Sequence, residues 1–144
     1  MTVRKSQMLA VVACALLVGC TQEPTPQGRT ERQTAEAYVQ ALNSRDVEAI
    51  VKLGPPGYEE VETAAREAVA ADGGRGLKID SIEVLHEFGA DLASTHVAAT
   101  DQKGRPFATY VPMFRHDGTW VVRLGHAPGA DKTGKSPSST EPLG

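Results

Sequence analysis

Aromatic residues, an excess of basic residues and long hydrophobic runs are all scarce or missing in this sequence. Aromatic residues make up only 5% of the 144 residues, so a core would be built mainly from Val, Leu, Ile and Ala. With 15 basic and 18 acidic residues the formal charge is −3. This balance argues against a nucleic-acid-binding protein, which would need a concentrated basic surface. No hydrophobic run is long enough to remain across a bilayer, no strong catalytic motif is present, and the length allows one modest domain.

The N-terminus has the pattern of an export signal. Arg4 and Lys5 form a positive region, and residues 8–19 follow as an uncharged apolar stretch. A helix of this length reaches about 18 Å, short of a bilayer core of about 30 Å, so we interpret the stretch as the hydrophobic region of a signal peptide. Two alternatives remain open. One is an ordinary secretory signal cleaved after Ala13 or Ala15; the other is a core helix of a cytosolic protein, which leaves the two basic residues unexplained.

The end of the apolar stretch carries a more specific motif. Leu17, Val18, Gly19 and Cys20 resemble the lipobox of bacterial lipoprotein signal peptides, in which a Leu and small residues precede an obligatory Cys. The resemblance implies that the Cys20 thiol receives a diacylglyceryl group and that the signal is cleaved between Gly19 and Cys20. Two acyl chains suffice for stable anchoring where one is marginal. We therefore expect a protein that is lipid-anchored to the cell membrane on its extracytoplasmic face.

Composition divides the chain into four segments. They are a signal peptide at residues 1–19, the lipidated Cys20 with a flexible tether at residues 20–29, a folded domain at residues 30–127, and a disordered tail at residues 128–144. The mature chain would have no free thiol, because Cys14 leaves with the signal and Cys20 carries lipid. Its 13 basic and 18 acidic residues would give a charge of −5. An anionic membrane repels such a body, so the lipid must hold it there.

Hydrophobic periodicity predicts three helices followed by four strands. Thr30 and Gln33 resemble a capping box that opens the first helix, a second helix begins near Asp46, and a third spans about residues 58–71. Period-two patterning predicts strands at residues 77–88, 91–100, 105–115 and 119–126, separated by turns at Gly89–Ala90, Gln102–Lys103–Gly104 and Asp117–Gly118. Three successive hairpins make an antiparallel meander, so the predicted fold class is α+β.

Two segments resemble one known superfamily. Residues 35–53 contain a helix with Tyr38, a turn with an Asp, and a short helix that ends at a Leu; residues 117–122 form an Asp-Gly turn followed by a Trp-bearing strand. Both are similar to the nuclear transport factor two-like superfamily, also called cystatin-like or SnoaL-like. The resemblance implies a cystatin-like cone, in which N-terminal helices pack on a curved four-stranded antiparallel sheet, often with a pocket in the concave face. Isomerase and cyclase branches use strand acids and sometimes a tyrosine on the first helix; Tyr38 fits the tyrosine position, but no strand Asp matches.

Hairpin pairing predicts which side chains share one face of the sheet. With Asp117–Gly118 as the turn, Trp120 lies opposite Arg115 and His126 lies opposite Thr109. Continuing the pairing across the Lys103–Gly104 turn brings His96 to the same face, and Glu83 joins it opposite His96. This face would also carry Phe107 and Met113. Apolar walls with a few polar groups are typical of a small-molecule pocket, so the predicted ligand contacts are Glu83, His96, Thr109, Trp120, His126 and Tyr38.

The pair of Glu83 and His96 has two interpretations. The carboxylate can keep the imidazole in one tautomer and raise its basicity, which would make His96 a general base or a ligand contact. Alternatively, both are hydrogen-bonded or exposed sheet residues near an edge, since a one-residue error in register reverses every face. The histidines at positions 86, 96, 116 and 126 lack the close spacing of metal ligands, so we expect no metal site and no cofactor. We assign no catalytic residue.

Two classes of function remain. The first is a non-enzymatic, lipid-anchored module that binds a small apolar ligand or an envelope protein. A homodimer is compatible with this class. The second is a small pocket enzyme of isomerase, dehydratase or hydrolase type. A wide, sealed concavity would favour ligand binding or catalysis, whereas a filled concavity with an exposed apolar outer face would favour a dimer or partner module. We expect the first class.

Overall fold

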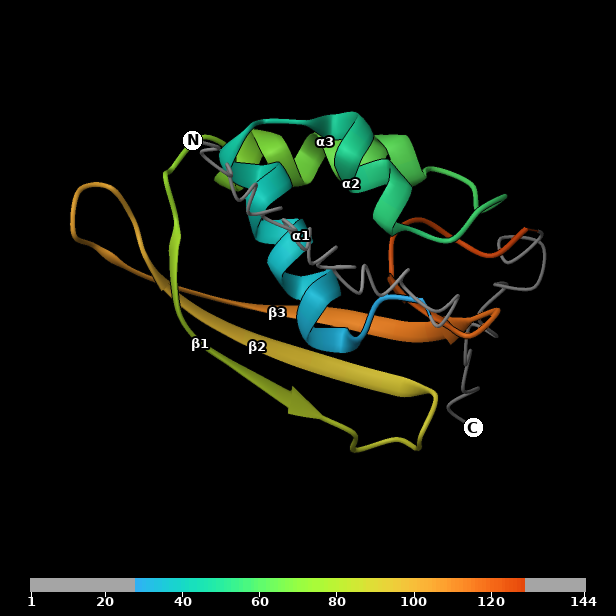
Figure 1. Cartoon of the computed structure of the whole chain (residues 1–144). Coiled ribbons are helices and arrows are strands. Elements are labelled where there is room, and N and C mark those ends of the chain that lie inside the picture. Colours follow the sequence, from blue (N-terminus) through green and yellow to red (C-terminus); the bar gives the residue numbers. More distant parts are fainter. Residues whose placement is uncertain (1–27, 129–144) are drawn as a thin grey trace, which may run out of the picture.

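The computed structural model describes residues 28–128, which form three helices packed over one face of a four-stranded sheet (Figure 1). The opposite face of the sheet points away from the helices (Figure 1). The predicted order of elements and the α+β class are confirmed. The predicted signal peptide, residues 20–27 of the tether and residues 129–144 of the tail lie outside the described residues.

The first two of the three helices begin at side chains that accept hydrogen bonds from their first turns. The three helices are α1 (Glu31–Asn43), α2 (Val47–Leu53) and α3 (Val61–Asp72). The predicted capping box of α1 is confirmed: the Gln33 backbone N–H donates to the Thr30 hydroxyl, and the Thr30 N–H donates to the Gln33 side chain. Asp46 caps α2 by accepting from the Ala49 N–H at 2.9 Å. These bonds satisfy amide groups that a helix leaves without an internal partner.

Helix α3 begins three residues later than predicted. Glu59 is paired through both its backbone N–H and its carbonyl with His126, each at 2.9 Å. Glu60 then adopts a left-handed backbone with φ of 61°. Because Glu59 is extended and paired with a distant segment, residues 58–60 are not part of the helix.

The sheet is a meander of four antiparallel strands in sequence order. They are β1 (Lys78–Leu85), β2 (Leu92–Thr100), β3 (Pro106–His116) and β4 (Thr119–Val122). Trp120 lies opposite Arg115, as the Asp117–Gly118 turn predicts. Glu83 lies opposite His96, also as predicted.

The predicted register between β2 and β3 is wrong by one residue. Thr100 pairs with Pro106, so five residues connect the strands instead of an even-numbered turn at Lys103–Gly104. Asp101 stabilises this turn, because its carboxylate accepts hydrogen bonds from the backbone N–H groups of Lys103 and Arg105 and from the Arg105 side chain. These bonds also hold the pKa of Asp101 below its ordinary value, the largest cause being the Arg105 backbone N–H. The shift places His96 opposite Tyr110 and moves it, with Glu83, to the outer face of the sheet.

The last strand is shorter than predicted, and the predicted pairing of His126 with Thr109 is wrong. β4 ends at Val122, and the chain then turns toward the start of α3, where His126 meets Glu59. Gly125 makes this approach possible: its φ is 67°, and a Cβ there would overlap the Glu59 carbonyl. Both the left-handed backbone and the close approach of Glu59 therefore exclude a side chain at position 125.

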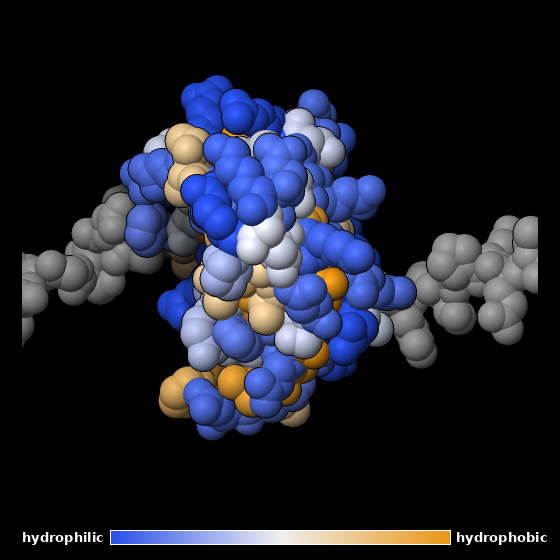
Figure 2. Space-filling view, turned by 90° about the vertical axis from the view of Figure 1, so that its left-hand side faces the viewer, coloured by the Kyte–Doolittle hydropathy of each residue, from blue (hydrophilic) through white to orange (hydrophobic). Residues whose placement is uncertain are grey.

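The helix-facing side of the sheet is filled by the core. Val97 of β2 and Val111 of β3 lie at its centre, fully buried, together with Leu42 and Ile50 of the helices. Trp120 is the one aromatic side chain among the buried residues of the described part of the chain. The centre of the predicted pocket face is thus core. At the end of the domain that carries the β2–β3 turn, the surface shows mostly hydrophilic residues (Figure 2).

Candidate functional site

A cavity of about 630 Å³ lies at the opposite end of the sheet, where β1 ends, β2 begins and β3 approaches its last residues. Its walls are mostly apolar and come from segments far apart in the sequence: Tyr58, Leu85, Phe88, Leu92, Met113 and Phe114. Three ionisable side chains also line it: Glu87, Arg123 and His126. This is the combination of apolar walls and few polar groups that small-molecule sites have.

Two aromatic rings form one wall of the cavity. The Tyr58 ring stacks on the Phe114 ring, with centroids 5.8 Å apart and planes inclined by 27°. Tyr58 is held there because the next residue, Glu59, is paired with His126. The stacked pair therefore depends on the left-handed turn at Glu60, after which α3 begins. Tyr58, a loop residue, supplies an aromatic surface that the helices do not supply.

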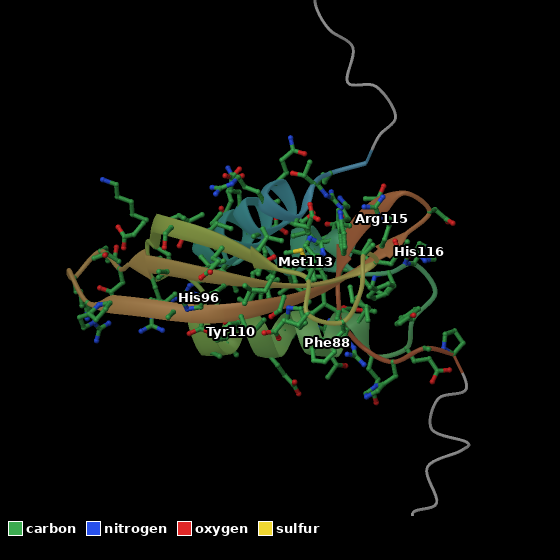
Figure 3. The ribbon with its side chains drawn as sticks, turned by 90° about the horizontal axis from the view of Figure 1, so that it is seen from below. Phe88, His96, Tyr110, Met113, Arg115 and His116 are labelled. Atoms are coloured by element: carbon green, nitrogen blue, oxygen red, sulfur yellow. The ribbon has the colours of Figure 1, made fainter. Side chains whose placement is uncertain are left out.

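The rim of the cavity is an exposed hydrophobic loop. Phe88, between β1 and β2, is 80% exposed, and Leu92, the first residue of β2, is 46% exposed. Figure 3 shows Phe88 at the end of the sheet that also carries Arg115 and His116. Large hydrophobic side chains that are exposed together at the mouth of a cavity indicate a contact surface for a ligand or partner.

The polar groups of the cavity differ in their pairing. His126 Nδ1 lies 3.0 Å from Glu60 Oε2, and both side chains are more than half exposed. Neither Glu87 nor Arg123 forms an ion pair with another residue in the range 28–128. The Arg123 backbone N–H is bonded to the Pro112 carbonyl at 2.8 Å, which places its side chain at the cavity wall. One cation and one anion are thus available to a ligand.

The sequence-predicted site is divided between two faces of the sheet. Glu83 and His96 are neighbours, and the His96 ring contacts the Tyr110 ring with centroids 4.7 Å apart, but this group lies on the outer face (Figure 3). Thr109 is half-buried on the helix-facing side, opposite Val97. The structure therefore does not bring Glu83 and His96 to the side chains they were predicted to join.

Trp120 is a packing residue rather than a cavity wall. It is 4% exposed, the His86 ring meets it edge-on at 5.6 Å, and the Arg115 guanidinium lies 5.1 Å from its centroid. His86 itself bridges two elements: its Nε2 lies 3.1 Å from Glu31 Oε1, and its Nδ1 lies 3.2 Å from the Leu92 carbonyl. This group joins the first turn of α1 to the β1–β2 loop.

Tyr38 is half-buried on α1 and packs against the core. Burial raises the pKa of its hydroxyl, and the nearby Asp72 carboxylate raises it further. Tyr38 does not line the cavity, and of the six predicted ligand contacts only His126 does. The lining residues that were not predicted from the sequence include Tyr58, Phe88, Leu92, Phe114 and Arg123. Phe88, an aromatic residue directly before the predicted Gly89–Ala90 turn, was the one signal in the sequence.

Three further sequence predictions concern anchoring and metal binding. Gly19 and Cys20 lie outside the described residues. Within residues 28–128, no three His, Cys, Asp or Glu side chains converge in a way that could hold a metal ion. No helix in that range is long and apolar enough to cross a membrane.

Comparison with known proteins identifies the fold. No protein-family model matches the sequence, and no curated protein matches it. Among solved structures, a Campylobacter jejuni protein described as a candidate NTF2-like transpeptidase is similar, with a TM-score of 0.50 and 16% sequence identity. The match covers 66% of this chain and 99% of that chain. The chain therefore has an NTF2-like fold, which confirms the fold predicted from residues 35–53 and the Asp117–Gly118 hairpin.

Proposed function

We propose that the chain is a lipid-anchored extracytoplasmic module that binds a small ligand with an apolar body. The cavity beside Tyr58 and Phe114 carries this proposal. Its volume of about 630 Å³ falls within the range of about 300–1,000 Å³ that small-molecule sites occupy. Glu87 and Arg123 would select the polar end of the ligand, because each charge lacks a partner among residues 28–128.

The sequence supports the anchoring half of the proposal. The N-terminus has the three parts of a lipoprotein signal in the required order: the basic residues Arg4 and Lys5, the short apolar stretch, and the lipobox at residues 17–20. Replacing the lipidated thiol should release the protein, since an anionic membrane repels the rest of an acidic chain. We expect Cys20→Ser to move the protein from the membrane fraction to the soluble fraction. Cys14→Ser, which changes the other cysteine, is the matched control and should stay membrane-bound.

The centre of the outer face, around Tyr110, is a poorer candidate for the binding surface than the end of that face, where Leu85, Leu92 and Phe114 line the cavity. Tyr110 is exposed at the centre, but it lies opposite His96, which in turn lies opposite Glu83, so the apolar surface is interrupted. Most large apolar side chains at the end of the sheet that carries the β1–β2 loop line the cavity instead. A small ligand in the cavity is therefore favoured over a partner protein on the sheet.

A small pocket enzyme is the second candidate, and the contact of His126 with Glu60 favours it. A carboxylate beside an imidazole is an arrangement used in general base catalysis. Both side chains are more than half exposed, so water competes with their interaction. Mass spectrometry of ligand recovered after incubation separates the two candidates: unchanged ligand supports a binding module, whereas turnover that His126→Gln abolishes supports an enzyme.

The binding experiment uses thermal stabilisation of the Cys20→Ser chain against a panel of metabolites and lipids. A ligand present at one hundred times its Kd stabilises the folded state by about 2.7 kcal/mol, which raises the Tm of a domain of this size by more than about 10 °C. Phe88→Ala should reduce the shift, because Phe88 lines the cavity. Tyr110→Ala removes another exposed aromatic side chain, one that lies outside the cavity, and should leave the shift unchanged. Equal losses in the two variants would contradict the cavity as the site.

A further inference from the structure

The segment that leads toward Cys20 joins the domain at the end that carries the cavity. The Arg29 carbonyl accepts a hydrogen bond from the Trp120 N–H at 3.3 Å, and a Cβ on Gly28 would overlap Thr119. Thr119 follows the β3–β4 turn. That turn and the β1–β2 loop lie at the same end of the sheet (Figure 1). Gly28, the cavity and the exposed loop therefore share one end of the domain.

The distance from the anchor to this end is limited by chain length. Eight peptide steps separate Cys20 from Gly28 in the sequence, and a fully extended chain covers at most about 3.4 Å per step, or about 27 Å in all. Whatever path the segment takes, a lipid on Cys20 keeps the Gly28 end of the domain within this distance of the bilayer surface. The β2–β3 turn lies farther along the sheet by the length of β3, about 33 Å.

The exposed hydrophobic side chains are concentrated at the same end. Three large hydrophobic residues are exposed in the described part of the chain; Phe88 and Leu92 lie here, and Tyr110 lies on the outer face of the sheet. The opposite end is mostly hydrophilic (Figure 2), and there the Arg75 guanidinium covers the Phe107 ring at 5.1 Å. The end of the domain nearest the anchor is thus more hydrophobic than the end that carries the β2–β3 turn.

We propose that this end docks on the lipid bilayer, with Phe88 and Leu92 at the level of the headgroups and the cavity open toward the membrane. The partner is a lipid surface, and the contact is apolar. Arg115 is paired with Asp91, so its charge is compensated, and the His116 ring lies 3.4 Å from Asp117. The inference rests on the lipid anchor proposed above. It adds an orientation and a route, since an apolar ligand would enter the cavity from the bilayer rather than from water.

The anchor and the apolar contact support each other. A single loop with two exposed hydrophobic residues binds a bilayer weakly by itself. An anchor within about 27 Å raises its effective concentration at the surface, which makes a weak second contact effective. Docking should therefore depend on the lipid at Cys20, and it should occur on uncharged phosphatidylcholine bilayers, because the mature chain is acidic.

The experiment places a tryptophan on each of two exposed aromatic positions in the full lipidated chain. Phe88→Trp and Tyr110→Trp are reconstituted into phosphatidylcholine vesicles with brominated acyl chains, which quench tryptophans that reach the bilayer. The native chain gives the background from Trp120, which is buried. We expect a severalfold greater loss of fluorescence in Phe88→Trp than in Tyr110→Trp. Equal quenching in the two variants, or quenching no stronger than the native background, would overturn the proposal.

The failures of the two proposals are distinguishable. If Cys20→Ser stays in the membrane fraction, the anchor is wrong. If Cys20→Ser is released but the lipidated Phe88→Trp chain is not quenched, the docking orientation is wrong and the anchor stands. Thermal stabilisation of the Cys20→Ser chain in the absence of membranes tests ligand binding separately from both.

Discussion

The junction between α1 and β1 depends on one side chain, and its removal gives a prediction that can be worked out in detail. Asn43, the last residue of α1, donates from Nδ2 to the Leu77 carbonyl at 2.8 Å and accepts from the Leu77 N–H at 2.6 Å. Leu77 is buried and precedes β1. The amide therefore satisfies both backbone groups of a buried residue that is 34 positions away.

We expect Asn43→Ala to lower the free energy of unfolding by about 2–4 kcal/mol. Each buried backbone group left without a partner costs about 1–3 kcal/mol, and partial solvent access at this site moves the total below the upper limit. Urea denaturation measures the change as a shift of the midpoint with an unchanged slope. A loss below about 0.5 kcal/mol, the usual size of a neutral surface substitution, would refute the reasoning.

The matched control, Asn43→Asp, separates the donor from the acceptor. The introduced carboxylate still accepts from the Leu77 N–H, but when ionised it has no hydrogen to offer the Leu77 carbonyl. When protonated, it can donate again. The pKa of this carboxyl should therefore be higher in the folded variant than in the unfolded chain, so its stabilising contribution is present at low pH and lost as the pH rises through the folded value. Relative to the native chain at the same pH, the variant should be more stable at pH 4 than at pH 7.

Two further predictions test the core and the β2–β3 turn. Ile50 is fully buried, so Ile50→Ala should cost about 2–5 kcal/mol in urea denaturation, whereas Val51→Ala, at a half-buried position, should cost clearly less; equal costs would contradict the assigned core. The pKa of Asp101 is lowered by the Arg105 backbone N–H, so its contribution is present above the ordinary carboxyl pKa of about 4 and is lost as the pH falls through the folded value. Asp101→Asn should therefore show a flatter fall of Tm below pH 4 than the native chain, and an identical fall would contradict this role.

Local sequence signals predicted the elements that depend on local interactions. Thr30 and Gln33 cap α1 through bonds between residues three positions apart, so the pattern of residue types was sufficient. The Asp117–Gly118 turn determines the pairing of Trp120 with Arg115, because a two-residue hairpin loop leaves one register. The fold class followed from three helices and three hairpins in succession.

The candidate site was not predictable in the same way. The Asp101 carboxylate accepts three hydrogen bonds within the β2–β3 turn and so stabilises a turn of five residues. Because this number is odd, the register shifts by one residue relative to the prediction, and Glu83 and His96 lie on the outer face. His126 reaches the cavity by pairing with Glu59, a contact between distant segments. The stacking of Tyr58 on Phe114 likewise has no local signature. A cavity built from such contacts is visible only once the chain is folded.

The burial of α1 has a consequence for the order of folding. The fully buried Thr34 hydroxyl lies 2.8 Å from the Thr30 carbonyl of its own helix and 3.2 Å from the Trp120 carbonyl, 86 positions away in the sequence. The three hairpins close short loops at little entropic cost, whereas α1 finds its last partner only in β4. In a nascent chain, α1 is therefore complete before the strands that pack on it have been made. Helix α1 packs against α2, β1 and β2 as well as β4, so part of its apolar side stays uncovered, and accessible to chaperones and proteases, until the final strand emerges.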